Sequence, residues 1–235
     1  MMKKSKITLL LCFFLAIPLT IYFGSRLPGR GYYLTSSLVL LEIMLPFFLA
    51  FEGRKPQARE LVVIAVLCAL AIAGRVVIPI PHFKPTFAII MLSAIAFGPE
   101  TGFMVGAVTA LGSNMFFGQG PHTPWQMFAY GTAGLLVGFL HQRGWLRRKP
   151  AAMAVWGAIL VVVLVGPILD TCTVFVSLTE ITLAGAGAIY LSGLPVNLSQ
   201  AAATFLTMLF LGKPLLEKLD RVKRRYGMME DEDGI

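Results

Sequence analysis

Residues 151–175 read AAMAVWGAILVVVLVGPILDTCTVF, and this long run carries a single charged residue, Asp170. An apolar run of about 20 residues is long enough to cross the hydrocarbon core of a bilayer as an α-helix. Further apolar runs lie elsewhere in the chain, at residues 7–23, 34–51, 61–80, 86–97, 102–117, 125–140 and 191–211. The apolar residues form continuous runs rather than the stripe of an amphipathic helix, so the sequence predicts an all-α integral membrane protein.

The composition agrees with this prediction. Of the 235 residues, 57% are hydrophobic and only 14% are charged, with a mean hydropathy of +0.77. A soluble domain carries roughly a quarter charged residues. Cys12, Cys68 and Cys172 lie within apolar runs, without the spacing of a metal or redox site, so we expect buried structural thiols, no bound metal and no cofactor.

Two of the apolar runs leave alternatives open. Residues 86–97 are too short to span a bilayer alone, so they are either extended by their flanks or shielded inside the bundle. Residues 7–23 follow the basic sequence MMKKSK and resemble either a signal peptide or a first membrane helix. Because no clear small-x-small cleavage motif follows, we favour a retained helix.

The basic residues predict the orientation in the membrane. With the amino terminus placed in the cytoplasm, most of the 20 Lys and Arg residues lie on the cytoplasmic side: Lys3, Lys4, Lys6, Arg54, Lys55, Arg59, Arg143, Arg147, Arg148, Lys149, Lys213, Lys218, Arg221, Lys223, Arg224 and Arg225. Such a bias predicts a multi-pass protein of the cell membrane with both termini cytoplasmic. The formal net charge of +8 is then a signal for topology and a contact for anionic lipid. A nucleic-acid-binding surface would need the basic residues gathered on one face, and the sequence does not place them in that way.

In this orientation, three connections emerge on the outer side, at residues 78–87, 113–128 and 170–197. They are rich in Pro, Gly, His, Asn and aromatic residues, whereas the inner connections are a tight turn and a basic loop. Polar, kinked outer connections above an apolar bundle are typical of a lid and pocket for an external ligand. The long third connection would suit a bulky ligand.

The connection SNMFFGQGPHTPWQMF (residues 113–128) mixes aromatic and polar side chains: Phe116, Phe117 and Trp125 with Asn114, Gln119, His122 and Gln126. An interfacial aromatic belt explains Trp125 and one Phe. A belt does not explain the interleaved polar groups, so we predict one wall of a ligand site. The candidate substrate-binding residues of the three connections are His82, Phe83, Lys84, Asn114, Phe116, Phe117, His122, Trp125, Gln126, Asp170, Tyr190 and Asn197.

Some of these candidates have a second interpretation. Asp170 and Arg75 both lie near the outer ends of their helices, so a structural ion pair between them is the alternative to a ligand role. His82 and His122 are either metal ligands or hydrogen-bonded loop residues, and the second is favoured. We assign no role to Glu42, and Glu180 is expected to be solvated at the tip of an outer loop.

Ala65, Ala69 and Ala73 place small side chains on one face of the run at residues 61–80. Small residues four apart allow a second helix to approach closely, and the alternative is ordinary packing within the protein. The chain contains no phosphate-binding loop of the G-x-x-x-x-G-K-[ST] type, no H-E-x-x-H and no G-x-S-x-G. We therefore expect no enzymatic activity in this chain, and any ATP hydrolysis would occur in partner subunits.

Three stretches together resemble a known family: AVLCALAIAGR (residues 65–75), PTFAIIMLSAIAFGPETGFMVGAVTALGSNMFFGQG (residues 85–120) and PWQMFAYGTAGLLVGFL (residues 124–140). From about Arg59 to Leu211, the chain resembles the substrate-binding S component of energy-coupling factor (ECF) transporters, the vitamin-uptake branch of the ABC systems. The tract FGPETGFMVGA followed by a Gly- and aromatic-rich connection is fairly specific for this family, whereas the alanine spacing alone is not.

The resemblance implies a six-helix substrate-binding core at residues 59–212, preceded by two accessory hydrophobic segments within residues 1–58 and followed by a charged cytoplasmic tail at residues 213–235. It implies that the face with Ala65, Ala69 and Ala73 docks on a membrane scaffold subunit carried by two cytoplasmic ATPases. The pattern is most similar to cobalamin-specific S components. Another vitamin, a nucleobase-like micronutrient or, in a different class, an intramembrane enzyme are the alternatives. The two accessory segments depart from the family pattern and have no assigned role.

Overall fold

The computed structural model describes residues 11, 15–24, 26, 31–53, 56–225 and 227. These residues form helices and short connections, with no strand among them. The helices are α2 (Ile17–Gly24), α3 (Gly31–Gly53), α4 (Ala58–Val76), α5 (Thr86–Phe97), α6 (Pro99–Phe117), α7 (His122–Gln142), α8 (Pro150–Leu160), the π-helix η2 (Val161–Val165), α9 (Gly166–Ser177) and α10 (Leu183–Arg225). The prediction of an all-α membrane protein is confirmed, whereas its division into two accessory segments, a six-helix core and a tail stays a prediction.

Three helical stretches of the described residues combine the length and the apolar composition needed to cross a membrane. They are Leu34–Gly53, Pro150–Ser177 and Leu183–Arg225. The second consists of α8, η2 and α9 in continuous succession. Pro167 has no N–H to donate to the preceding turn, and the N–H of Gly166 bonds the carbonyl of Val161 five residues earlier. The π-helical segment thus allows the spanning helix to continue through a proline.

Helix α5 lies inside the bundle. All 12 of its residues are buried, and it packs against α4, α6, α7 and α10. A helix of this length covers only about 18 Å, well short of the hydrocarbon thickness. The structure therefore confirms the second of the two alternatives for residues 86–97: neighbouring helices shield a short helix.

Helices α6 and α7 form the closest helix pair of the fold, and glycines make this possible. A Cβ atom on Gly106 would lie 2.3 Å from the carbonyl oxygen of Tyr130, and one on Gly134 would lie 2.3 Å from that of Gly102. A Cβ atom on Gly138 would lie 2.4 Å from the Cα of Pro99. The two backbones are therefore in contact, as small residues spaced four apart permit in membrane helices.

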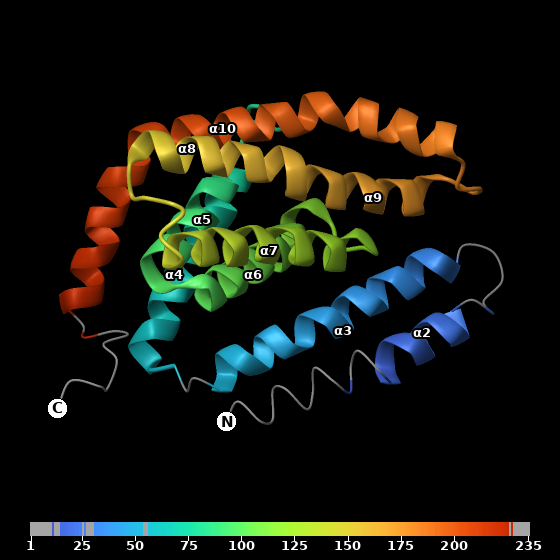
Figure 1. Ribbon diagram of the computed structural model, residues 1–235, viewed down its shortest axis with the longest axis horizontal. Helices are drawn as coiled ribbons and strands as arrows, with labels where there is room; N and C mark the ends of the chain where they lie inside the picture. Colours follow the sequence, from blue (N-terminus) through green and yellow to red (C-terminus); the bar gives the residue numbers. More distant parts are fainter. Residues whose placement is uncertain are drawn as a thin grey trace.

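The N-terminal hairpin of α2 and α3 covers a side of the bundle away from α10 (Figure 1). Helix α3 packs on α6, α7 and α9. The ring of Phe47 stacks on Phe103 of α6, with centroids 4.7 Å apart, and the Ser37 hydroxyl donates to the carbonyl of Pro121 at 3.0 Å. Residues 1–10, 54 and 55, with Lys3, Lys4, Lys6, Arg54 and Lys55, lie outside the described residues, so the amino-terminal orientation stays a prediction.

The prediction of long outer connections at residues 113–128 and 170–197 is wrong. Helices α6 and α7 are joined by residues 118–121, and α9 and α10 by residues 178–182. Polar and glycine-rich sequence did not end these helices, because a backbone in the membrane must satisfy its own hydrogen bonds. Helix α10 also continues past residue 212, so the expected tail begins inside a helix; its red, C-terminal part, which contains Pro214, bends away (Figure 1).

The contact between α6 and α7 can be tested by adding one methyl group. Gly106→Ala should lower the free energy of unfolding by about 1–3 kcal/mol, because the new Cβ meets backbone that cannot rotate away. Thermal unfolding in detergent would report this as a lower Tm. Gly187→Ala is the matched control, since a Cβ at this helical position of α10 meets nothing within 4 Å. Equal Tm values for the two variants would contradict the assigned contact.

Candidate functional site

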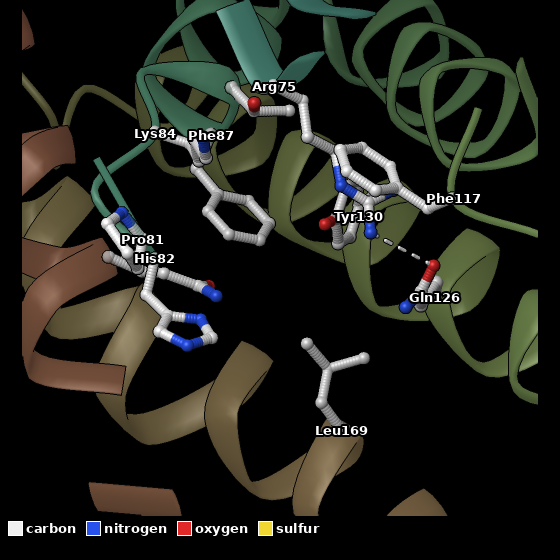
Figure 2. Close-up of a pocket in the computed structure, with 11 residues that line it drawn as sticks. Arg75, Pro81, His82, Lys84, Phe87, Phe117, Gln126, Tyr130 and Leu169 are labelled. Carbon is white, nitrogen blue, oxygen red and sulfur yellow. Dashed lines mark hydrogen bonds between the residues drawn. The ribbon is translucent and has the colours of Figure 1, made fainter. Parts of the chain in front are cut away.

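A cavity of about 440 Å³ lies between the ends of several helices and the connection that joins α4 to α5. Figure 2 shows the side chains around it, with Arg75, Phe117 and Tyr130 grouped together and His82 and Leu169 facing them across the open space. The lining residues are Arg75, Pro81, His82, Lys84, Thr86, Phe87, Phe117, Gln126, Tyr130, Leu169 and Gln200. A cavity of this volume with mixed lining is typical of small-molecule sites.

Arg75 at the end of α4 is the main charged group of the cavity. Its guanidinium donates to the Ser113 hydroxyl and to Oδ1 of Asn114 at 3.1 Å. It also donates to Oε1 of Gln126 at 3.4 Å, the bond drawn in Figure 2. Within the part of the chain that the structure describes, no carboxylate pairs with it. A cation held only by neutral acceptors inside a membrane protein keeps its attraction for an electron-rich or anionic group.

Aromatic rings form one wall of the cavity. Phe87 and Tyr130 are both almost fully buried and meet edge to face, with centroids 4.6 Å apart. The Arg75 guanidinium lies 5.1 Å from the ring centroid of Phe117 and 5.4 Å from that of Tyr130. The rings present flat apolar surface beside the cation, which suits a ligand with a planar apolar body and polar edges.

Gln200 of α10 supplies an unused acceptor. Its Oε1 atom is buried and has no hydrogen-bond partner, although the residue lines the cavity. A buried acceptor without a partner costs about 1–3 kcal/mol, so a ligand N–H or O–H at this point would recover that free energy. Arg75 of α4 thus supplies donors to the cavity, and Gln200 of α10 adds a lining side chain whose acceptor atom is buried and unpaired.

The connection from α4 to α5 closes one side of the cavity in a strained conformation. His82 has a φ of 58°, the left-handed region that a histidine seldom occupies. The N–H of Phe83 bonds the carbonyl of Pro81 at 2.7 Å, so the chain makes a three-residue turn around His82. Lys84 donates to the carbonyl of Ile78. Backbone strain of this kind is concentrated at ligand-binding segments.

Of the substrate-binding candidates from the sequence, His82, Lys84, Phe117 and Gln126 line this cavity. Asn114 does not line it, but its side chain is 1% exposed and accepts from Arg75. Asn114 also donates to the Thr123 hydroxyl at 3.2 Å, so it joins the end of α6 to the start of α7. The structure thus gives Asn114 a role in holding the Arg75 guanidinium.

The other candidates of the first two connections lie elsewhere. Trp125 packs in a separate cluster with Leu40 of α3 and Cys172 of α9. Its ring meets Phe175 edge to face at 5.5 Å. The side chain of Phe116 is 69% exposed, and Phe83 and His122 are half-buried without lining the cavity. On α7, Gln126 faces the cavity, whereas the neighbouring Trp125 faces α3.

Asp170 and Asn197 bind each other rather than lining the cavity. The Asn197 amide donates to Asp170 Oδ2 at 2.8 Å, and both side chains are buried. The alternative of an Asp170–Arg75 ion pair is not observed between these described residues. The Tyr190 hydroxyl lies 2.6 Å from that of Thr171, a second polar contact between α9 and α10. These candidates hold two helices together.

Several lining residues escaped the sequence analysis. Tyr130 and Gln200 interrupt apolar runs with a polar group, and such an interruption is the signal that would have identified them. Phe87 and Leu169 are ordinary apolar residues in apolar runs, so no sequence signal marks them. The sequence indicates Arg75 only as an ion-pair partner for Asp170.

The alanine face of α4 points outward. Ala65, Ala69 and Ala73 are all exposed, in contrast to the buried Leu67 and Ala71 on the inner face. Helix α4 packs on α5 and α6, whereas the accessory helix α3 packs on α6, α7 and α9. The internal-packing interpretation of the alanine stripe therefore does not apply to the folded chain.

We predict that Trp125 stabilises the fold rather than contacting the ligand. Trp125→Ala removes a ring that is 8% exposed and should lower the free energy of unfolding by about 3 kcal/mol or more. Trp145→Ala, at a position that is 70% exposed, is the control and should change little. Thermal unfolding in detergent measures both. A Trp125→Ala protein as stable as the parent would show that the cluster with Leu40 and Cys172 is not formed.

Comparison with known proteins gives relatives over part of the chain. UPF0397 proteins from Vibrio atlanticus (strain LGP32), Aliivibrio fischeri (strain MJ11) and Aliivibrio salmonicida (strain LFI1238) are each 33% identical over 88 residues. The match covers 35% of this chain and 48% of each relative, so it spans about half the length of these relatives. No solved structure matches the chain.

A family model matches a longer part. The model described as "ECF-type riboflavin transporter, S component" matches residues 55–218, which include α4 to α9, α10 as far as residue 218, and every residue that lines the cavity. This match covers more than half of the chain and agrees with the family resemblance of the sequence. The chain therefore belongs to the family of ECF-type riboflavin transporter S components.

Proposed function

We propose that this protein is the substrate-binding subunit of an ECF-type vitamin importer in the cell membrane. The observation that carries the proposal is the Arg75 guanidinium, which has no carboxylate partner among the described residues and lies beside a cavity of about 440 Å³. The cavity lies at the ends of α4 and α6 and the start of α7, the outer side in the orientation that the basic residues predict. A vitamin would enter there from outside.

We further propose riboflavin as the substrate in place of cobalamin. The family model is named for riboflavin transporters. The cavity volume lies in the range of drug-sized ligands, roughly 300–1,000 Å³, and a corrin with its side chains and nucleotide loop is much larger than such a ligand. The short connections at residues 118–121 and 178–182 leave little chain that could open for a corrin.

A flavin ring matches the arrangement of groups in the cavity. Its flat body suits the rings of Phe87, Phe117 and Tyr130. One edge of the ring carries two carbonyl oxygens with an N–H between them. The carbonyls can accept from Arg75, and an N–H or a ribityl hydroxyl can donate to the free Oε1 of Gln200. This pairing would satisfy both the cation and the buried acceptor.

We also propose that the exposed face of α4 docks on a membrane scaffold subunit that carries two cytoplasmic ATPases. The exposure of Ala65, Ala69 and Ala73 supports this, because small side chains let a second helix approach. The accessory helices α2 and α3 leave this face open, since α3 packs on α6, α7 and α9. Family members are transporter subunits, and the energy for uptake would come from the partner ATPases.

The ligand proposal is tested by binding to the purified full chain. Riboflavin fluorescence should be quenched on binding, whereas cobalamin should not compete. Arg75→Gln and Gln200→Leu should each weaken riboflavin binding at least tenfold, the scale of a hydrogen bond to a charged group or of a buried polar group left unpaired. Gln142→Leu, at the far, exposed end of α7, is the control. Tight cobalamin binding, or parent-like riboflavin binding by both cavity variants, would overturn the assignment.

The docking proposal predicts that a variant of the α4 face loses uptake but keeps ligand binding. Ala69→Trp should abolish uptake by cells, because the large ring would hold the α4 and scaffold backbones apart, while ligand binding to the isolated subunit stays unchanged. Ala184→Trp, at an exposed position on α10, is the matched control and should transport normally. Normal uptake by the Ala69→Trp protein would remove this stripe from the interface.

A further inference from the structure

A second hollow lies between the stretch α8–η2 and α10. Its volume is about 620 Å³, and all of its lining residues are apolar. Among them are Ile159, Val162, Val163, Ala202, Phe205 and Leu206. Both walls belong to stretches long and apolar enough to cross a membrane, so the groove opens into the hydrocarbon layer. Figure 1 shows α8 and α10 side by side along this face.

The π-helical turn supplies one wall of this groove. Val162 and Val163 belong to η2, where the extra residue per turn widens the helix before Pro167. The opposite wall contains the small side chains of Ala201 and Ala202, which leave the space unfilled. A void in the bilayer forfeits dispersion contacts along its walls, so a hydrocarbon chain gains contacts by filling it.

Two lysines lie at the cytoplasmic end of the same two helices. Helices α8 and α10 run antiparallel, because a Cβ on Gly157 would meet Met208 and one on Gly212 would meet Met153. Lys149 precedes α8, and Lys213 lies two turns beyond Leu206 on the same side of α10. At 1.5 Å per residue, Lys213 is about 10 Å from the end of the groove, and Lys149 is about 15 Å from Ile159. A phospholipid whose acyl chain lies in the groove would place its head group at about this distance, near the two lysines.

The two lysines are available to an anion. Lys149 is exposed, and the Lys213 side chain is 68% exposed. The Lys213 ammonium lies 3.9 Å from the Glu217 carboxylate, but a solvated pair at this distance holds it weakly. The nearby Arg148 is committed to Asp220 at 2.8 Å and to the carbonyl of Ile95 at 2.9 Å. Residues 150–212 contain no Lys or Arg, so on these two stretches the positive charge lies only beyond the cytoplasmic end of the groove.

We propose that this groove binds an anionic phospholipid, with an acyl chain between η2 and α10 and the phosphate at Lys149 and Lys213. The charge favours this occupant over a zwitterionic lipid, whose head group carries no net charge for the two lysines to attract. The two lysines also favour a phospholipid over a partner helix, because an apolar helix would need no pair of cations at the end of its groove. The groove and the vitamin cavity share no lining residue. The groove is also separate from the α4 face, since α4 packs on α5 and α6 rather than on α8 or α10.

The test is native mass spectrometry of the full chain after purification with mixed phosphatidylglycerol and phosphatidylcholine. The parent should retain phosphatidylglycerol preferentially. Ala202→Phe and Leu206→Trp, which fill the groove, should abolish this retention, and Ala188→Phe, at an exposed site elsewhere on α10, should not. The double variant Lys149→Gln, Lys213→Gln should lose about tenfold of the preference, and the control Lys218→Gln, Lys223→Gln should lose much less.

Several results would overturn the proposal. Equal retention of the two lipids by the parent would show that no anionic site exists. Parent-like retention by both groove-filling variants, with native helicity by circular dichroism, would show that the lipid binds elsewhere. Equal losses in the two lysine pairs would indicate a diffuse basic surface. Crosslinking of position 206 to another polypeptide chain in the assembled transporter would assign the groove to a partner helix.

Discussion

The backbone contact between α6 and α7 is the constraint on which the remaining structure depends. Gly102 and Gly106 on one helix face the backbone of Tyr130 and Gly134 on the other, and the space between them does not admit a Cβ atom on Gly106 or Gly134. Inside a bilayer there is no hydrophobic drive between helices, so close packing and polar contacts must supply the cohesion. This contact brings the end of α6 and the start of α7 together, and the four residues 118–121 are enough to join them.

Other elements are fitted around this pair. The ring of Phe103 lies over Gly131, where a Cβ would approach within 2.7 Å, and Phe47 of α3 stacks on the same ring. The accessory hairpin is thus attached through an aromatic side chain that the helix pair holds. Helices α9 and α10 use polar contacts instead, with Asn197 bound to Asp170 and Tyr190 close to Thr171. Such contacts contribute about 0.6 kcal/mol on average in a membrane, and at most about 1.7 kcal/mol.

The same helix pair accounts for the chemistry of the cavity. Ser113 and Asn114 on α6 and Gln126 on α7 reach Arg75 only because the two helix ends are adjacent. Neutral oxygens orient the guanidinium without neutralising it, so its charge remains for a ligand. The strained turn at His82 and the unpartnered acceptor of Gln200 lie on other sides of the same space. The strained turn and the unpaired acceptor both cost folding free energy, and both lie at the cavity. Such costs are concentrated at binding sites.

The sequence by itself determined the class of the protein, the approximate positions of its core helices but not their ends, and the orientation expected from its basic residues. These follow from local quantities, namely the lengths of apolar runs and the distribution of Lys and Arg, because a bilayer imposes one length and one charge rule on every span. The glycines at 102, 106, 134 and 138 also stand in the sequence at spacings of four. Their pairing across α6 and α7 did not follow from spacing alone.

The tertiary structure decided which side chains share a cavity. His82, Lys84, Phe117 and Gln126 were identified from local composition, whereas Phe87, Leu169 and Gln200 came from helices far apart in the chain. Trp125 and Gln126 are neighbours in sequence, but the 100° turn between adjacent helical residues sends one toward α3 and the other toward Arg75. Composition shows that a polar and aromatic segment exists. Only helix rotation and packing determine which of its side chains face the ligand.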